Sequence, residues 1–142
     1  MFSTAHIHPM LVHFPIALIM VGFLAELISL FFKKEACLSF TGFWLLVTGT
    51  LAALAAFLSG SFFTGDMTGA AGAVKETHEL FATVTLCSLI LCALFRIYLK
   101  TSGKERDIMK WIAFALYAIS AISVSITGFY GGSLVFNYMM PL

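Results

Sequence analysis

Histidine is the residue type in this sequence that could most readily bind a metal ion or a haem. The chain contains four histidines: His6, His8 and His13 lie close together near its start, and His78 stands alone. Neutral imidazole is the commonest protein ligand for metal ions and a frequent axial ligand of haem. In helix bundles such sites are built from side chains on facing helices. The histidines are therefore the first candidates for a functional site.

A b-type haem would use two of these histidines, taken from different helices. It also needs apolar walls and small residues that leave room for the ring. His8, His13 and His78 are the candidate axial ligands. Glycines late in the chain would give the clearance, or would serve helix packing alone: Gly128, Gly131 and Gly132.

A zinc or copper ion would instead need a tighter cluster of ligands. The candidates are the four histidines and one acidic residue: His6, His8, His13, His78 and Asp66. The spacing of His6 and His8 is common beside metal ions, although it carries little information by itself. Solvated or hydrogen-bonded histidines with no bound ion are a further alternative.

The rest of the sequence is too apolar for a soluble domain. Of its 142 residues, 61% are hydrophobic and 11% are charged, against about 25% charged residues in soluble proteins. The net charge of +1 gives no sign of nucleic-acid binding. Most of the chain is therefore expected to lie in lipid.

Four apolar segments are long enough to cross a bilayer, which takes about 20 residues in a helix. They cover about 9–32, 38–63, 78–99 and 108–136. A backbone in lipid has to satisfy its own hydrogen bonds, so we expect four helices. Short connections favour a single all-α domain, an up-down-up-down transmembrane bundle. Residues around the first histidines and around His78 do not match, so no convincing internal repeat is visible.

The positive residues predict the orientation of this bundle. Most of the Lys and Arg residues fall on one side, which the positive-inside rule places in the cytoplasm: Lys33, Lys34, Arg96, Lys100, Lys104, Arg106 and Lys110. Both termini and the histidines are then extracytoplasmic, at the outer ends of two helices. His13 and His78 are expected to approach each other across the bundle, while His8 is expected to point elsewhere.

Two other groups of residues bear on function. Glu26 lies within the first predicted span, where a carboxylate is a candidate functional residue unless its side chain reaches the membrane surface or pairs near it.

The three cysteines lack the spacing of a haem attachment site and are interpreted as structural: Cys37, Cys87 and Cys92. No common catalytic motif is present, which favours an electron carrier or accessory subunit over an enzyme.

The stretch 8–18, HPMLVHFPIAL, resembles the opening motif of a family of small bacterial membrane proteins, domain of unknown function 2231. Asp66, His78 and the stretch 131–135, GGSLV, also match that family. The resemblance implies four helices in a bacterial inner membrane, with the histidines on one side. Relatives joined to cytochrome c or Rieske modules imply a redox setting.

Two hypotheses follow. In the first, the protein is a b-type cytochrome that passes electrons at the extracytoplasmic face to a cytochrome c, a Rieske protein or another respiratory protein. In the second, it is a non-catalytic accessory or assembly subunit, whose histidines are structural or bind zinc or copper. The small-residue helix faces would then pack against partner helices or a second copy of the chain.

Overall fold

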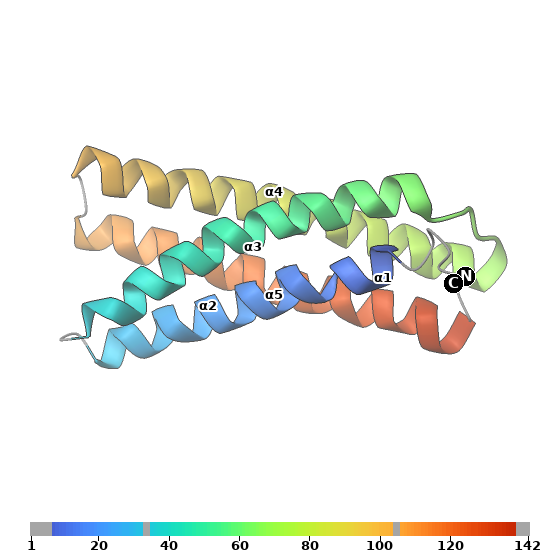
Figure 1. The fold of residues 1–142 in the computed structure, drawn as a ribbon, viewed down its shortest axis with the longest axis horizontal. Helices are drawn as coiled ribbons and strands as arrows, with labels where there is room; N and C mark the ends of the chain where they lie inside the picture. Colours follow the sequence, from blue (N-terminus) through green and yellow to red (C-terminus); the bar gives the residue numbers. More distant parts are fainter. Residues whose placement is uncertain (1–6, 33–34, 104–105, 139–142) are drawn as a thin grey trace.

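The computed structural model describes residues 7–32, 35–103 and 106–138, and in these segments it contains helices and no strand. The helices are α1 (Ile7–Leu11), α2 (His13–Phe31), α3 (Ala36–Phe63), α4 (Gly69–Ser102) and α5 (Asp107–Tyr138). The first two follow one another directly, so the described residues form four candidate membrane spans: His8–Phe31, Ala36–Phe63, Gly69–Ser102 and Asp107–Tyr138. The predicted all-α bundle of four long apolar helices is confirmed (Figure 1).

The helices are longer than the apolar segments that predicted them. α4 begins at Gly69 and continues to Ser102, so both His78 and Arg96 lie inside it. The predicted span 78–99 therefore covers only part of this helix, and the expectation that His78 lies at its outer end is wrong. Apolar length marks only the part of a helix that lies in hydrocarbon, and helix formers such as Ala70, Ala71, Ala73, Lys75 and Glu76 can extend the helix outside it.

The bundle consists of two antiparallel hairpins. The first span and α3 form the first hairpin, and α4 and α5 form the second (Figure 1). Most of the packing between helices occurs within each hairpin, and the two hairpins meet along a narrower interface. Both hairpins begin at the same end of the bundle.

The second hairpin repeats the first. The shift of 70 residues from His8 to His78 also aligns the burial patterns of the first span and α4 almost position by position. The buried equivalents in that comparison are Pro15 and Thr85, Ile19 and Leu89, and Gly22 and Cys92. On α3 and α5, with a shift of 71 residues, they are Gly42 and Ala113, Leu46 and Tyr117, Gly49 and Ser120, and Ala53 and Val124. The fold therefore contains an internal repeat in burial that the residue identities do not show.

Since both hairpins start at one end, the repeats run parallel, and an approximate two-fold axis lies along the bundle. A residue that contacts its own equivalent must lie near that axis. His8 and His78 do so at one end of the bundle, and Glu26 and Arg96 do so at the other. We refer to these as the histidine end and the ion-pair end.

The core lies where the two hairpins meet. Ile19, Leu46, Leu89 and Tyr117 are fully buried there. At Gly22 the side chain of Tyr117 comes close to the backbone of α2. The hydroxyl of Tyr117 occupies the space that a side chain at Gly22 would need. A large aromatic side chain of one hairpin thus packs against bare backbone of the other.

We expect Gly22→Ala to destabilise the protein by about 1–3 kcal/mol, the usual cost of overpacking a tight core. The added Cβ would overlap the Tyr117 hydroxyl and lie 2.8 Å from the Leu45 Cβ. Thermal unfolding of the detergent-solubilised protein measures the effect. Gly132→Ala is the matched control, since nothing lies within 4 Å of its added Cβ. Equal unfolding temperatures for the two variants would contradict the packing of Tyr117 against α2.

Candidate functional site

The fold brings His8 and His78 together at the histidine end. Their ring centroids are 6.3 Å apart, and the ring planes are nearly perpendicular, at 78°. Both side chains are half-buried. Because His8 belongs to the first hairpin and His78 to the second, this contact joins the two repeats.

Each imidazole is oriented by the second helix of its own hairpin. Nδ1 of His8 lies 3.0 Å from the carbonyl oxygen of Ala56 and 2.9 Å from Oγ of Ser59. Nδ1 of His78 lies 3.0 Å from the carbonyl oxygen of Thr127. A carbonyl oxygen can only accept, so each Nδ1 carries the proton and donates it. In the neutral ring this leaves a lone pair on Nε2, the atom that can bind a metal.

The Cε1 atom of each ring also lies close to a glycine one turn beyond the carbonyl partner. A Cβ at Gly60 would lie 2.9 Å from Cε1 of His8, and one at Gly131 would lie 3.1 Å from Cε1 of His78. The same arrangement of histidine, carbonyl and glycine therefore occurs in both hairpins. Sequence reasoning missed Gly60, and its equivalence to Gly131 under the repeat is the signal that could have found it.

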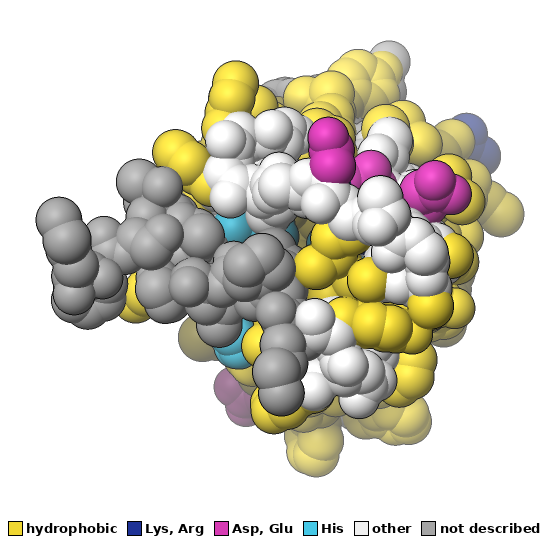
Figure 2. All heavy atoms as spheres, turned by 90° about the vertical axis from the view of Figure 1, so that its right-hand side faces the viewer, with side chains coloured by type: hydrophobic (Ala, Val, Ile, Leu, Met, Phe, Trp, Pro, Cys, Tyr) yellow, Lys and Arg dark blue, Asp and Glu magenta, His cyan; other side chains and the backbone are white. Residues whose placement is uncertain are grey.

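These two histidines, together with His13, form part of the wall of a cavity of about 590 Å³ at this end, which we call the histidine cavity. Its lining comes from both hairpins and is mostly apolar, with many small residues, among them Ala53, Ala56, Ala82, Gly128, Gly131 and Gly132. Figure 2 looks onto this end and shows histidine side chains beside apolar ones, with acidic side chains on the same face. A flat apolar molecule could enter such a space.

The three predicted glycines have different surroundings within this lining. Gly131 lies against His78, whereas a Cβ at Gly128 would lie 3.2 Å from Cδ1 of Ile16. Gly132 has open space where a side chain would be. Gly131 therefore gives clearance to a histidine, Gly128 allows helix packing, and Gly132 leaves room in the cavity.

The histidine whose ring contacts His78 is His8 rather than His13, so the expectation that His8 points elsewhere is wrong. His8 heads the buried stripe of the first span, followed by Pro15, Ile19 and Gly22, which share one helical face. His13 is exposed, and its Nδ1 lies 2.7 Å from the carbonyl oxygen one turn before it. Glu26 continues the same face. Following that face from Glu26 back towards the N-terminus would have identified His8, rather than His13, as the inward-facing histidine.

The remaining predicted metal ligands do not join the histidine pair. Asp66 is exposed and lies 3.9 Å from the Lys75 ammonium group. His6 lies outside the described residues. Within the segments that the structure describes, no three His, Cys, Asp or Glu side chains are grouped closely enough to hold a metal ion.

A second pair of equivalent residues lies at the ion-pair end. Nη1 of Arg96 is 3.0 Å from Oε2 of Glu26, and these side chains are only 13% and 12% exposed. Nη1 has no well-aligned hydrogen-bond partner among the described residues, so this contact is electrostatic rather than an in-line hydrogen bond. Ser39 Oγ donates to the carboxylate at 3.3–3.4 Å. Glu26 therefore pairs inside the bundle, with a residue of the other hairpin.

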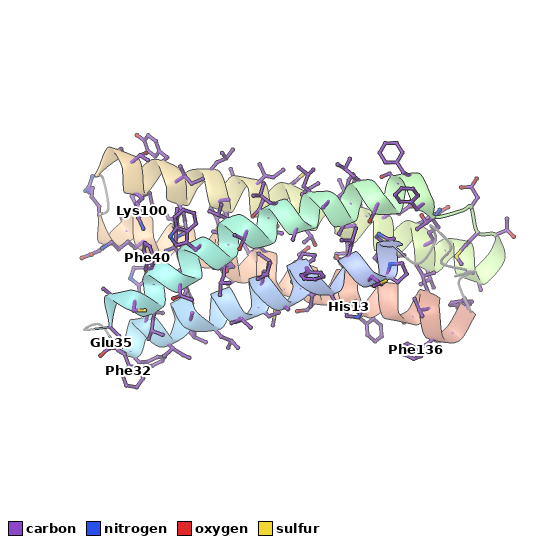
Figure 3. The ribbon with its side chains drawn as sticks, viewed as in Figure 1. His13, Phe32, Glu35, Phe40, Lys100 and Phe136 are labelled. Carbon is purple, nitrogen blue, oxygen red and sulfur yellow. The ribbon has the colours of Figure 1, made fainter. Side chains whose placement is uncertain are left out.

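A cation–π contact between Lys100 of α4 and two phenylalanines of α3 also joins the hairpins at this end. Nζ of Lys100 lies 4.7 Å from the ring centroid of Phe40 and 4.4 Å from that of Phe43. Figure 3 shows Lys100 and Phe40 close together at the end of the bundle opposite to His13 and Phe136. Such cation–π contacts contribute about 0.5–2 kcal/mol, more where water is excluded.

The sequence of residues 4–141 matches the protein family described as "Predicted membrane protein (DUF2231)". The chain belongs to this family. No curated protein and no solved structure matches it. In this DUF2231 protein, several of the residues that carry the family resemblance gather at the histidine end: His8, His78, Gly131 and Gly132. The protein is thus an integral membrane protein whose family motifs coincide with the histidine cavity.

Removing one partner of the buried ion pair should be costly. We expect Glu26→Ala to destabilise the DUF2231 protein by about 3–5 kcal/mol, because Arg96 would stay charged and unpaired inside the bundle. The swap Glu26→Arg with Arg96→Glu should recover much of this loss. Thermal unfolding in detergent measures both. Glu79→Ala is the control, because Glu79 is 59% exposed and Lys75 keeps the Gly65 carbonyl and Asp66 as partners, so the loss should be small. A Glu26→Ala variant as stable as this control would show that the pair is not buried.

Proposed function

We propose that this protein binds a b-type haem between His8 and His78 and transfers electrons. The supporting observation is the 6.3 Å separation of the two ring centroids. A haem bound there would be held by one imidazole from each hairpin. A centroid separation of about 6 Å would leave room for one metal ion between two such rings, because a metal–nitrogen bond is about 2 Å long.

The residues fit haem better than a bare metal ion. A zinc site takes four protein ligands, or three and a water, and this pair offers two nitrogens. In a haem the porphyrin supplies four nitrogen ligands to the iron, so the protein would have to supply only two. The histidine cavity, with its volume of about 590 Å³ and its small apolar lining, also lies in the size range of cofactor pockets.

The chain's own contribution is to orient ligands and exclude water. The carbonyl groups of Ala56 and Thr127 accept from the Nδ1 atoms, which holds each ring in one tautomer and raises its basicity as a ligand. Gly60 and Gly131 let the rings lie close to the helix backbone. A bound haem would supply one-electron transfer, and the protein would tune it through these contacts and the apolar walls.

The charge distribution supports an extracytoplasmic location for this site in a bacterial inner membrane. Lys100, Arg106 and Lys110 lie at the ion-pair end, which the positive-inside rule assigns to the cytoplasm. Lys33, Lys34 and Lys104 fall outside the described residues. Both termini and the histidine cavity then face the other side, where a cytochrome c, a Rieske protein or another respiratory carrier could exchange electrons.

The test is the visible spectrum of the protein purified in mild detergent after expression with ample haem. We expect a sharp Soret band and, on reduction, the split α and β bands of low-spin haem with two axial ligands. His8→Ala and His78→Ala should each abolish this spectrum. His13→Ala should preserve it, because His13 borders the cavity with an exposed side chain whose Nδ1 bonds to the carbonyl of Pro9 one turn earlier.

Haem that stays low-spin in the His8→Ala and His78→Ala variants would contradict the ligand assignment. A featureless spectrum, with stoichiometric zinc or copper in elemental analysis, would favour the accessory-subunit hypothesis instead.

A further inference from the structure

The two hairpins orient their histidines with different numbers of hydrogen-bond acceptors. Nδ1 of His8 has two oxygen atoms within hydrogen-bond distance, the carbonyl oxygen of Ala56 at 3.0 Å and Oγ of Ser59 at 2.9 Å. Within the described part of the chain, Nδ1 of His78 has one, the carbonyl oxygen of Thr127 at 3.0 Å. The histidine pair is therefore less symmetric than the repeat that builds it.

The difference comes from one position on the second helix of each hairpin. Ser59 on α3 corresponds to Tyr130 on α5 under the shift of 71 residues. The ring of Tyr130 stacks on that of Phe81, with centroids 6.0 Å apart and an angle of 13° between the ring planes. Tyr130 thus packs on a ring of its own hairpin, whereas Ser59 places an oxygen atom beside the histidine.

The positions of the protons around Ser59 follow from what each atom can donate or accept. Ser59 has one hydroxyl proton, which it donates to the carbonyl oxygen of Ala56, 2.7 Å away. Its oxygen lone pairs are then available to Nδ1 of His8. The carbonyl oxygen can only accept, so a proton on Nδ1 satisfies both oxygen atoms, whereas a bare Nδ1 would face a carbonyl lone pair. His8, Ser59 and Ala56 therefore form a closed triangle of hydrogen bonds.

The needs of its own helix do not explain why Ser59 lies against the histidine. Serine and threonine in helices commonly donate to a carbonyl three or four residues earlier, which satisfies the hydroxyl by itself. Thr50 on the same helix does so, with Oγ1 2.7 Å from the carbonyl oxygen of Leu46. Thr50 and Ser59 are both buried, at 9% and 5% exposed. Ser59 differs because its oxygen also accepts from a side chain of another helix.

We propose that Ser59 is a positioning residue that makes His8 the more firmly held and the more strongly donating of the two histidines. The second acceptor holds the ring in the tautomer whose Nε2 lone pair is free for a ligand. Hydrogen bonding at the outer nitrogen of a histidine also raises its basicity as a ligand. The consequence for haem rests on the proposed function: Ser59 favours the oxidised iron and so lowers the reduction potential.

The first experiment needs no haem, so it separates this proposal from the proposed function. NMR of the haem-free protein in lipid bilayers, with ¹⁵N-labelled histidine, measures how fast the Nδ1 proton of His8 exchanges with water. Ser59→Ala removes one of the two acceptors and should speed this exchange by about 2–10-fold, the factor expected for the loss of one hydrogen bond. Ser59→Thr retains a hydroxyl group and should keep the slow rate.

Thr50→Val is the matched control, because it removes a buried hydroxyl of the same helix that bonds to its own backbone. It should exchange like the wild type. Circular dichroism and gel filtration first show that each variant is folded. Ser59→Cys, which has a weak sulfur acceptor in place of the oxygen, serves if Ser59→Ala misfolds. A bare Nδ1 on His8 in the wild type overturns the proposal, as does unchanged exchange in the folded Ser59 variant or equal acceleration in Thr50→Val.

The second experiment measures the reduction potential of the haem-loaded protein. Ser59→Ala should raise the potential relative to the wild type, whereas Ser59→Thr and Thr50→Val should leave it unchanged. An unchanged potential in Ser59→Ala would show that Ser59 does not strengthen His8 as a ligand. A wild type that binds no haem contradicts the proposed function, and the exchange rates then still decide whether Ser59 positions His8.

Discussion

A polar side chain inside a membrane has to find its partner within the protein, because lipid offers none. In this bundle Glu26 finds its partner, Arg96, in the opposite hairpin. His8 and His78 bond to carbonyl groups of their own hairpins and meet each other through their rings. The ion pair and the ring contact therefore both set the register between the hairpins. The histidine cavity depends on that register, since a shift of either hairpin along the axis would separate the two rings.

The internal repeat explains why the site has two similar halves. In each hairpin a histidine of the first helix donates to a carbonyl of the second and lies against a glycine one turn later. The repeat is nevertheless filled asymmetrically. Opposite charges occupy equivalent positions at the ion-pair end, where two like charges would repel, and hydroxyls replace small apolar residues in the second hairpin. The two hairpins thus share one backbone arrangement but differ in their interior side chains. Two hydroxyl-bearing residues of the second hairpin, Thr85 and Thr127, line the histidine cavity.

Apolar length was enough to predict four helices. Which histidine would contact His78 was harder to predict, because the face that His8 presents depends on how the chain stays helical past Val12 and Pro15. The partner of Glu26 was not identified, because Arg96 was considered only among the positive residues that set the orientation. The repeat was missed because Ile19 and Leu89, or Leu46 and Tyr117, share burial rather than identity, and burial is visible only in the folded chain.

The central claim, that His8 and His78 face each other on the axis, can be measured directly by solid-state NMR in lipid bilayers. The sample is a variant in which His6 and His13 are replaced by Gln and the two remaining histidines carry ¹³C and ¹⁵N. With ring centroids 6.3 Å apart, long-mixing spectra should show cross-peaks between the two imidazoles that disappear in a further His8→Gln variant. Two resolved histidine signals without any ring-to-ring cross-peak would contradict the account.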